Sequence, residues 1–476
     1  MTSKKQDTKR TAHHDPNRAV KHSPKNTLEH THARLNHAPN PTIVNSANSY
    51  ACPVAQQCGA CQLLDVPYDK QLSQKQASIV ELFEDIATSQ TICYPVLGMA
   101  EPFYYRNKVT SPYAPGKKRR GATTNHSQKQ HSQSKQSKKQ QTRKQRHPSL
   151  PYEVRCGMYA AHSHRIIPTD ECLLENKTAK AIILAIRDLM ERFGIEAYRE
   201  DSGTGFIRHA IVRVGHTSGE VLVTLVTNGR DFPGAKKFVQ ELVKRCPAIT
   251  SIVQNINTRQ TNVILGEKEQ RLYGPGFILD KLCGLSFRIS SHSFYQVNSE
   301  QTEVLYRRAI EMANLGGTET VMDAYCGTGT IGLVAAHGLD GSPGAKRVIG
   351  VDNVESAIAD AKNNARHNGI ENADFVVADA GEFMTSLADD EGGIDVLLMD
   401  PPRAGSSEAF LHAACTLAPE TIVYISCNPK TQQRDAIYLC NHGYKLAEIQ
   451  AVDMFPHTDH IENICRFVRA QCYTNC

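Results

Sequence analysis

The sequence predicts an α/β protein whose C-terminal domain, residues 301–476, follows a smaller α+β domain within residues 51–300. Three observations support this prediction. From about residue 300, short apolar strands alternate with helical stretches. A glycine-rich turn at 326–332 stands between one such strand and the next helix. Between residues 178 and 265, helical stretches alternate with pairs of strands. A chain of 476 residues can hold two such cores without disulfides.

Two polar, basic segments stand apart from these domains. Residues 1–50 carry eight Lys and Arg against three Asp and Glu, and residues 115–150 carry eleven against none. Both segments have few large apolar residues and cannot bury enough surface to offset their chain entropy, so we expect them to be disordered. Their charge suits sequence-independent attraction to phosphates, although solubilising spacers have the same composition.

The central region shows a mixture of helices and strands. The spacing of apolar residues predicts helices at 68–87, 178–194 and 234–245, an extended segment from residue 105, and strands at 205–214, 220–227, 249–257 and 261–265. Arg208 and His209 fall on one of these strands. They are candidates for RNA contacts or for the solvated side chains of an edge strand.

Three of the fifteen cysteines stand close together near the start of the central region. Cys52, Cys58 and Cys61 form a tight loop that can fill three corners of a soft metal site. The fourth ligand would be Cys172 or Cys156. An iron–sulfur cluster, a zinc ion and a chance group of structural thiols all remain open. No secretory signal accompanies the cysteines, which argues against a disulfide framework and for a cytoplasmic protein.

Acidic residues follow the predicted strands of the C-terminal domain. The strand at 319–325 leads into the glycine-rich turn, and the strand at 347–351 ends at Asp352. A glycine turn allows close approach of a ligand, and an acid at the next strand end can accept both hydroxyls of a ribose. Strands 373–378 and 394–399 end at Asp379 and Asp400, and two prolines stiffen the loop after Asp400. The sequence therefore predicts a site for a nucleoside-containing cofactor at this edge of a parallel sheet.

A cysteine and a glutamate complete the candidate chemistry. Cys427 follows the strand at 421–426, beside an Asn and a Pro, in a position typical of an exposed nucleophile. Glu462 lies in a loop crowded with titratable groups before the last strand and is the best candidate for a base. His457 and His460 in the same loop more often orient other groups or face solvent.

Taken together, these motifs resemble the RNA uracil-5-methyltransferases, particularly the bacterial 23S ribosomal RNA branch that carries an iron–sulfur cluster. The resemblance runs from Cys52 to about residue 470. It includes the cysteine loop, Ser-Phe-Tyr-Gln-Val-Asn at 293–298, the glycine turn, Asp-Pro-Pro-Arg at 400–403, Ser-Cys-Asn-Pro at 426–429 and Phe-Pro-His-Thr-Asp-His-Ile-Glu at 455–462. Residue by residue, it implies Cys52, Cys58, Cys61 and Cys172 as ligands of a [4Fe-4S] cluster, Gln296, Tyr325, Asp352, Asp379 and Asp400 as contacts to S-adenosylmethionine, Cys427 as nucleophile and Glu462 as base.

The resemblance also implies a fold and a function. The C-terminal domain would be a class I, Rossmann-like, S-adenosylmethionine-dependent methyltransferase domain. The expected reaction is methylation of C5 of a uridine in 23S ribosomal RNA by a cytoplasmic, monomeric enzyme without membrane contact. Transfer RNA is the alternative substrate, and a non-catalytic, cluster-bearing RNA-binding or assembly factor is the alternative function. Residues 1–50 lack the run of strands that would build the RNA-binding β-barrel of many relatives, and Asp352 stands where many relatives have Glu.

Overall fold

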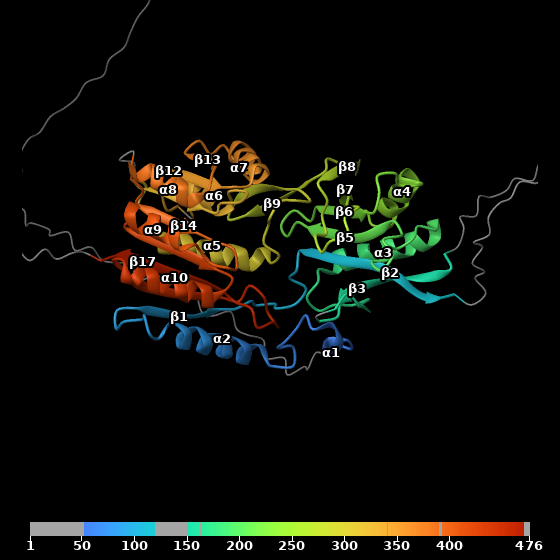
Figure 1. Ribbon diagram of the computed structural model, residues 1–476, viewed down its shortest axis with the longest axis horizontal. Coiled ribbons are helices and arrows are strands. Elements are labelled where there is room, and N and C mark those ends of the chain that lie inside the picture. The colour runs from blue at the N-terminus through green and yellow to red at the C-terminus, as the bar shows by residue number, and fades with distance from the viewer. Residues whose placement is uncertain (1–51, 120–149, 162, 340, 390–392, 471–476) are drawn as a thin grey trace, which may run out of the picture. The chain divides into compact units, whose positions relative to one another are not determined.

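The computed structural model describes residues 52–119, 150–161, 163–339, 341–389 and 393–470 (Figure 1). The N-terminal tail and most of the basic insertion, both expected to be disordered, lie outside the described residues. The helices are α1 Ala55–Cys58, α2 Tyr68–Phe83, α3 Lys177–Phe193, α4 Ala235–Arg245, α5 Ser299–Ala313, α6 Thr330–His337, α7 Glu355–His367, α8 Ala380–Asp389, α9 Glu408–Leu417 and α10 Pro429–Asn441.

The strands form two large sheets and one hairpin. The eight-stranded sheet has the order β1 (Ile92–Leu97), β16 (Tyr444–Val452), β17 (Glu462–Arg469), β15 (Thr421–Ser426), β14 (Val396–Met399), β11 (Thr320–Ala324), β12 (Arg347–Asp352) and β13 (Ala373–Val377). The seven-stranded sheet has the order β4 (Ile166–Pro168), β3 (Tyr152–Tyr159), β2 (Lys108–Lys118), β5 (Ile207–Val214), β6 (Val221–Thr227), β7 (Ile249–Ile256) and β8 (Lys268–Tyr273). The hairpin pairs β9 (Ile278–Leu282) with β10 (Leu285–Ile289).

The eight-stranded sheet has the architecture of an open α/β domain. Strands β13, β12, β11, β14 and β15 run parallel to their neighbours, and β17 is antiparallel to both β15 and β16. The carboxyl ends of the five parallel strands therefore meet at one edge, where β17 begins. Ligands of open α/β sheets bind at this edge, which we call the catalytic rim.

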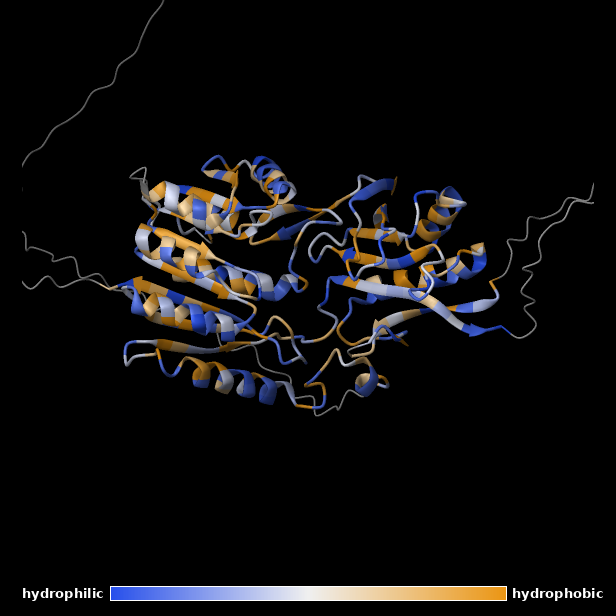
Figure 2. Ribbon diagram, viewed as in Figure 1, coloured by the Kyte–Doolittle hydropathy of each residue, from blue (hydrophilic) through white to orange (hydrophobic). Residues whose placement is uncertain are grey.

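Helices cover both faces of this sheet, and each face has its own apolar core. One core joins α5, α6 and α7 to the sheet through Leu305, Leu333 and Ile358. The other joins α2, α8, α9 and α10 through residues such as Phe83 and Phe410. Figure 2 shows that the strands are largely hydrophobic whereas the helices alternate hydrophobic and hydrophilic residues. This pattern is expected for a sheet that is buried on both faces.

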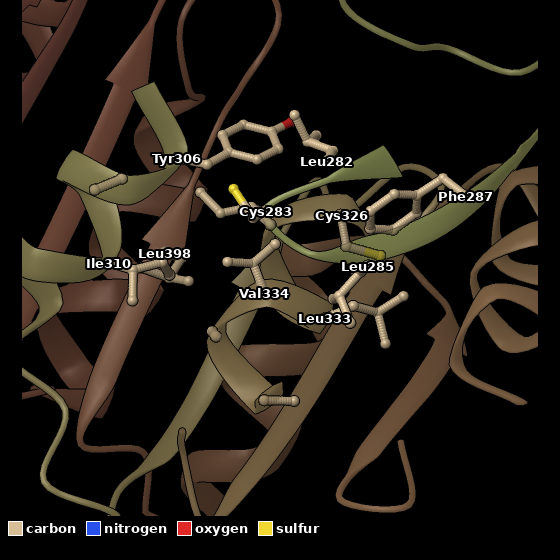
Figure 3. Packing of buried hydrophobic residues seen from close by; sticks show 14 of the residues in the cluster. Leu282, Cys283, Leu285, Phe287, Tyr306, Ile310, Cys326, Leu333, Val334 and Leu398 are labelled. Carbon is tan, nitrogen blue, oxygen red and sulfur yellow. The ribbon is translucent and has the colours of Figure 1, made fainter. Parts of the chain in front are cut away.

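The β9–β10 hairpin packs against the first of these cores. In Figure 3, Leu282, Leu285 and Phe287 of the hairpin lie beside Tyr306 of α5 and Val334 of α6. Two backbone amides of β10 also donate to asparagines of α7, from Ser286 to Asn368 and from Arg288 to Asn364. The hairpin is therefore anchored on the catalytic domain although it precedes residue 301.

The boundary expected near residue 300 is wrong for α2 and β1, which also belong to the eight-stranded sheet. Strand β1 pairs in parallel with β16, so a segment placed with the central domain forms the sheet edge. Lys75 of α2 donates to Asp453 at 2.6 Å, and Tyr68 donates to the same carboxylate at 2.8 Å. These contacts between residues more than 350 positions apart are invisible to local periodicity.

The seven-stranded sheet forms the core of the central domain. Helices α3 and α4 pack on it through residues such as Ile186 and Phe238. The insertion expected to begin at residue 115 begins later, because β2 continues to Lys118, which pairs with Tyr152 of β3. Residue 150 is likewise not part of it, since Leu150 lies buried in this core.

The strand expected at 261–265 is absent from the described structure, and β8 begins only at Lys268. Asn257 donates through Nδ2 to the carbonyls of Val263 and Ile264, at 2.7 and 2.9 Å, and so bends these residues into a loop. Strand β8 itself is polar and mostly exposed, which hides it from a search for apolar alternation. None of the described helices is long and apolar enough to cross a membrane.

Candidate active site

The catalytic rim collects most of the site residues that the sequence predicts. Strands β13, β12, β11, β14, β15 and β17 occupy one run of the sheet, apart from the outer strands β16 and β1. At or just beyond the rim ends of these strands stand Asp379, Asp352, Tyr325, Asp400, Cys427 and Glu462, in that order. The residues expected to bind the nucleoside thus occupy one half of the rim, and the residues expected to do chemistry occupy the other.

The glycine-rich turn after β11 has the left-handed backbone that glycine permits. Gly327 and Gly329 have φ angles of +54° and +77°, and Tyr325 at +63° shares this conformation. A Cβ on Gly329 would lie 2.8 Å from the Phe375 ring, so that glycine is needed for packing. A Cβ on Gly327 would meet no atom within 4 Å, which leaves open space beside the turn.

Asp352 is fixed at the end of β12 by two backbone amides. Gly327 donates to its Oδ2 at 3.0 Å, and Val354 donates to its Oδ1 at 2.9 Å. Each carboxylate oxygen retains a second lone pair. The geometry therefore suits a carboxylate that accepts hydrogen bonds from a ribose diol next to the open side of the glycine turn.

Asp379 lies further along the rim and is exposed. Its Oδ1 accepts hydrogen bonds from the amides of Gly381 and Glu382, at 2.9 and 3.1 Å, at the start of α8. The local role of this residue is therefore that of a helix cap, and one carboxylate oxygen is committed to it.

Asp400 follows β14 at the centre of the rim. Burial raises the pKa of its carboxyl to about 7. Burial also raises the pKa of Asp323 on β11 to about 8, even though its Oδ2 accepts a hydrogen bond from Gly332, and the charge of Asp400 adds to this increase. The rim centre thus holds carboxyl groups that bind protons unusually well and that a cationic ligand would stabilise as anions.

The Asp400 loop is fastened to the start of α10. The amide of Gly405 donates to the carbonyl of Pro402 at 2.8 Å and closes a turn. The carbonyl of Arg403 accepts hydrogen bonds from Asn428 Nδ2 at 3.0 Å and from Thr431 Oγ1 at 3.2 Å. Because Asn428 is the neighbour of Cys427, these bonds fix the proline loop relative to that cysteine.

Cys427 and Glu462 lie close together at the ends of two paired strands. The last residue of β15, Ser426, pairs with Asn463 of β17, so the next positions, Cys427 and Glu462, are adjacent. Glu462 is only 3% exposed, and its burial raises the pKa of its carboxyl well above the usual range, with Asp400 contributing. Burial, followed by the charges of Glu462 and Asp400, raises the pKa of the Cys427 thiol to about 11.

Arg403 is the cation of this group. Its guanidinium opposes the increase in pKa of both Cys427 and Glu462. The side chain is exposed, and Nη2 lies 3.3 Å from Nδ1 of His460. No role for Arg403 was predicted from the sequence, although its position directly after two prolines at a strand end could have indicated one.

Gln296 lies outside the rim strands, just before α5. Asn107 donates through Nδ2 to the Gln296 carbonyl at 3.0 Å and to Ser299 Oγ at 2.8 Å. Arg213 of the central domain donates to the carbonyl of Ser293 at 2.6 Å. The central domain therefore holds the 293–299 segment through its backbone.

His457 is a structural residue of the last loop. It is buried, lies stacked on Phe103 with ring centroids 4.5 Å apart, and is held by Gln71, whose Nε2 lies 3.1 Å from Nδ1. Burial lowers its pKa to about 4, so the ring is neutral near pH 7. His460 is exposed beside Arg403.

The cysteine loop lies against the central domain. Cys52, Cys58, Cys61 and Cys172 line one small pocket, together with Leu64 and Met158. Cys156 does not belong to it and lies in the core of the central domain. Burial and the neighbouring thiols raise the pKa of Cys61 to about 12. Among the described residues, no three His, Cys, Asp or Glu side chains are placed to hold a metal ion.

Three cations gather where the central domain meets the 293–299 segment. Burial, together with the charges of Arg213 and Arg106, lowers the pKa of Lys108 to about 8, and burial lowers the pKa of Arg213 to about 10. Nε of both arginines is buried without a hydrogen-bond partner. Within the described part of the chain, no carboxylate is among the groups that act on the pKa of Lys108 or Arg213, so these charges have no anionic partner there.

Comparison with known proteins identifies the family of this chain. Residues 316–467 match the family model described as a methyltransferase domain. An uncharacterized RNA methyltransferase of Halalkalibacterium halodurans is 40% identical over 87% of this chain and 82% of its own length. One from Clostridium acetobutylicum is 38% identical over 87% and 82%. This chain belongs to the RNA methyltransferase family.

A solved structure extends the comparison to most of this RNA methyltransferase. It is the tRNA (uracil-54, C5)-methyltransferase of Pyrococcus abyssi in complex with S-adenosyl-L-homocysteine, with a TM-score of 0.64 and 26% identity. The match covers 87% of this chain and 86% of the other. The α/β methyltransferase fold that the sequence predicts is confirmed.

Proposed function

We propose that this RNA methyltransferase transfers a methyl group from S-adenosylmethionine to C5 of a uridine in 23S ribosomal RNA. The pairing of Cys427 with Glu462 at the catalytic rim carries the proposal, because methylation of an amino group would need neither residue. The Pyrococcus abyssi neighbour, a uracil-C5 methyltransferase by its name, supports the choice of C5 as the methylated atom.

The rim residues fit the proposed methyl donor. Asp352 would hold the ribose, Asp379 would meet the adenine edge, and Gln296, Tyr325 and Asp400 would complete the pocket. The open side of Gly327 provides room for close backbone approach. When bound, the sulfonium supplies the methyl group and a positive charge. The carboxyl groups at the rim centre suit that charge because an adjacent cation favours their ionised form.

The chemistry of uracil requires the pair of residues on β15 and β17. C5 of uracil is too poor a nucleophile to accept a methyl group directly. Addition of the Cys427 thiolate to C6 forms an S–C6 bond and moves electron density onto C5. C5 would then take the methyl group, while the bond between the methyl carbon and the donor sulfur breaks and a neutral thioether leaves. Glu462 removes the proton from C5, the C5–C6 double bond forms again, and the S–C6 bond breaks to release Cys427. In folded RNA, the uridine must leave its stack to reach this pocket.

The substrate RNA can be ribosomal or transfer RNA. The cysteine loop favours the ribosomal branch, and the solved neighbour, named for a tRNA uracil, favours transfer RNA. In the test, the enzyme is incubated with naked 23S ribosomal RNA or with transfer RNA, each containing 5-tritiated uridine, and the tritium released to water is measured. We expect release from ribosomal RNA. Release from transfer RNA alone would reverse the choice of substrate, and release from neither would overturn uracil C5 methylation.

We propose a [4Fe-4S] cluster, rather than a zinc ion, as the group that the cysteine pocket binds. Zinc would bring its four sulfurs to within about 3.8 Å of each other, given Zn–S bonds of about 2.3 Å in a tetrahedron. The described side chains show no such convergence, yet all four cysteines line one pocket. A cluster spaces its cysteine ligands more widely because iron and sulfide lie between them. We therefore propose Cys52, Cys58, Cys61 and Cys172 as its ligands.

Replacing one of these cysteines tests the cluster. We expect anaerobically purified protein to contain iron and to absorb visible light, and Cys58→Ser to lose most of both, because the substitution removes one of the four thiolates that would hold the cluster. Cys93→Ser changes an exposed cysteine elsewhere and should keep both signals. Stoichiometric zinc without iron in the wild-type protein would contradict the assignment.

The three cations near Gln296 predict a pH-dependent affinity for RNA. Lys108, with its pKa lowered to about 8, is charged below that pH and neutral above it. We expect the affinity to fall by up to about tenfold per pH unit above pH 8, because binding then requires uptake of a proton. Filter binding of RNA between pH 7 and 9 measures this effect.

Two substitutions assign that effect to Lys108. Lys108→Arg stays charged and should remove the decline above pH 8. Lys108→Gln should weaken RNA binding at lower pH. It should also reduce the slope of log affinity against log salt concentration by the amount expected for the loss of about one phosphate contact. Lys281→Gln, at an exposed position on β9, serves as the control. A decline that persists unchanged in Lys108→Arg would refute this role.

A further inference from the structure

The central domain contains a pocket, lined by aromatic and polar side chains, that the proposed reaction does not use. It has a volume of about 440 Å³. Tyr159 of β3, Tyr198 and Glu200 before β5, Arg208 and His209 of β5, and the loop 260–264 line it. We call it the β5 pocket. Its volume lies in the range of about 300–1,000 Å³ that is typical of small-molecule sites, and its lining is aromatic and polar.

The aromatic part of the β5 pocket suits a flat ring. The imidazoles of His164 and His209 meet Tyr159 at interplanar angles of 71° and 61°. In the part of the chain that the structure describes, no ring lies flat on Tyr159. The guanidinium of Arg208 lies 4.4 Å from the centre of the Tyr198 ring. Nucleobases stack on such aromatic and guanidinium planes.

The polar part of the pocket offers hydrogen-bond acceptors. Tyr159 donates to Glu200 Oε1 at 3.2 Å, and Nδ1 of His164 lies 3.0 Å from Glu200 Oε2. Each of these carboxylate oxygens can accept a further hydrogen bond. Burial lowers the pKa of His209 to about 4, so that ring is neutral near pH 7 and adds no positive charge. An exocyclic amino group of adenine, cytosine or guanine is a matching donor.

The buried Arg208 guanidinium adds a positive charge that no direct ion pair neutralises among the described residues. It donates to the carbonyls of Asn257 and Arg259, at 2.8 and 2.7 Å, and so fixes the beginning of the 257–266 loop. Among the described residues, no carboxylate lies within ion-pair distance of it. The lining holds both this cation and the Glu200 carboxylate, so it suits a ligand with a hydrogen-bond donor for Glu200 and an anionic group for Arg208. A nucleotide carries both groups.

The β5 pocket and the catalytic rim can be reached by one RNA. Arg208 and Arg213 stand five residues apart on β5, a span of about 17 Å at about 3.4 Å per residue. Arg213 holds Ser293, three residues before Gln296. The 257–266 loop also reaches this segment, because Nε2 of His292 lies 3.0 Å from the carbonyl oxygen of Gly266. The two sites are thus connected by one strand and one loop.

We propose that the β5 pocket binds one unpaired nucleobase with an exocyclic amino group, from the same RNA that presents its uridine to Cys427. The proposal rests on the proposed function for the identity of the methylated base. The β5 pocket holds the second base by stacking on Tyr159 and by donation to Glu200. Its role is to position the RNA and to add specificity, without contact to the reacting atoms.

The experiment measures tritium release from an RNA fragment that the wild-type enzyme methylates. Tyr159→Ala should raise KM for this RNA roughly tenfold and leave kcat unchanged, since stacking on an aromatic residue acts on binding. Tyr159→Phe keeps the ring and should stay within about threefold of the wild type. Tyr273→Ala removes an exposed tyrosine of β8 in the same domain and should have no effect. Thermal unfolding of each variant confirms that it is folded.

Abasic substitution of the RNA identifies the base. At one non-target position whose base has an amino group, removal of the base should lower kcat/KM of the wild-type enzyme for that RNA roughly tenfold. The same abasic RNA should cause no further loss with Tyr159→Ala, because the two changes remove the same contact. An unchanged KM in folded Tyr159→Ala would overturn the proposal, as would losses that add independently at every position. If the wild type releases no tritium, the proposed function fails. In that case, filter binding of 23S ribosomal RNA to Tyr159→Ala and to the wild type tests RNA binding by the β5 pocket independently of the reaction.

Discussion

Cys427→Ala is expected to lower tritium release from uridine by at least about 10⁴-fold, the scale of loss when a covalent nucleophile is removed. The reason is chemical, because without the S–C6 bond C5 stays too electron-poor to take the methyl group. Cys415→Ala, at a partly buried cysteine of α9, is the matched control and should retain activity. Substantial activity of Cys427→Ala would contradict covalent catalysis by this residue.

The pH dependence of the same step follows from the thiol. Burial raises the pKa of Cys427 to about 11. As long as the pH is below that value, the reactive thiolate fraction therefore grows about tenfold for each unit by which the pH rises. The rate of adduct formation with 5-fluorouridine RNA should therefore rise from pH 6.5 to 9 in the presence of the methyl donor. Fluorine cannot leave C5 as a proton does, so the adduct persists and can be counted by denaturing electrophoresis. A rate that is flat over this range would contradict thiolate attack.

Glu462→Gln is expected to trap the enzyme on its substrate. Addition of Cys427 and methyl transfer need no proton acceptor at C5, whereas release of the RNA does. The variant should therefore transfer one methyl group per enzyme, lose turnover by about 10²–10⁴-fold, and accumulate covalent enzyme–RNA complex that denaturants do not separate. Burial raises the pKa of Glu462 well above its usual value, so its carboxylate, once ionised, is a stronger base than that of an exposed glutamate.

A matched substitution separates this role from a general effect of charge. Glu420→Gln changes an exposed glutamate just before β15 and should turn over normally. The double variant Cys427→Ala with Glu462→Gln should form no covalent complex. If Glu462→Gln were inactive without any trapped RNA, another group would have to remove the C5 proton.

The catalytic rim was predictable because parallel strands align their carboxyl ends. Once the strands that end at Asp352, Asp379 and Asp400 are identified, the fold alone predicts that these three residues lie at the same edge of the sheet. The adjacency of Cys427 and Glu462 did not follow, because it depends on the antiparallel register of β15 with β17. Sequence marked both residues as candidates, and only the register brings them together.

Other features depend on contacts that no local pattern records. Spacing left both Cys172 and Cys156 open as the fourth ligand, and it does not record that Cys172 lines the pocket of the other three cysteines while Cys156 lies in an apolar core. The group of cations near Gln296, which contains Arg106, Lys108 and Arg213, was likewise not predicted. A sequence such as Arg106-Asn107-Lys108 does not show whether carboxylates lie near it in the fold. The roles assigned to the rim and cysteine residues stay predictions until the substitutions above are made.

Strand β1 has a consequence for how the protein is made on the ribosome. It is synthesised more than 300 residues before its partner β16, and the whole seven-stranded sheet is translated between them. The central domain can close early, since its contacts are nearer in sequence, whereas the outer edge of the larger sheet must wait for nearly the last residues of the chain. Shortened chains that end before β16 will therefore carry an unpaired strand and will leave Ile79 and Phe83 of α2 less well covered, and they should be prone to aggregation and proteolysis.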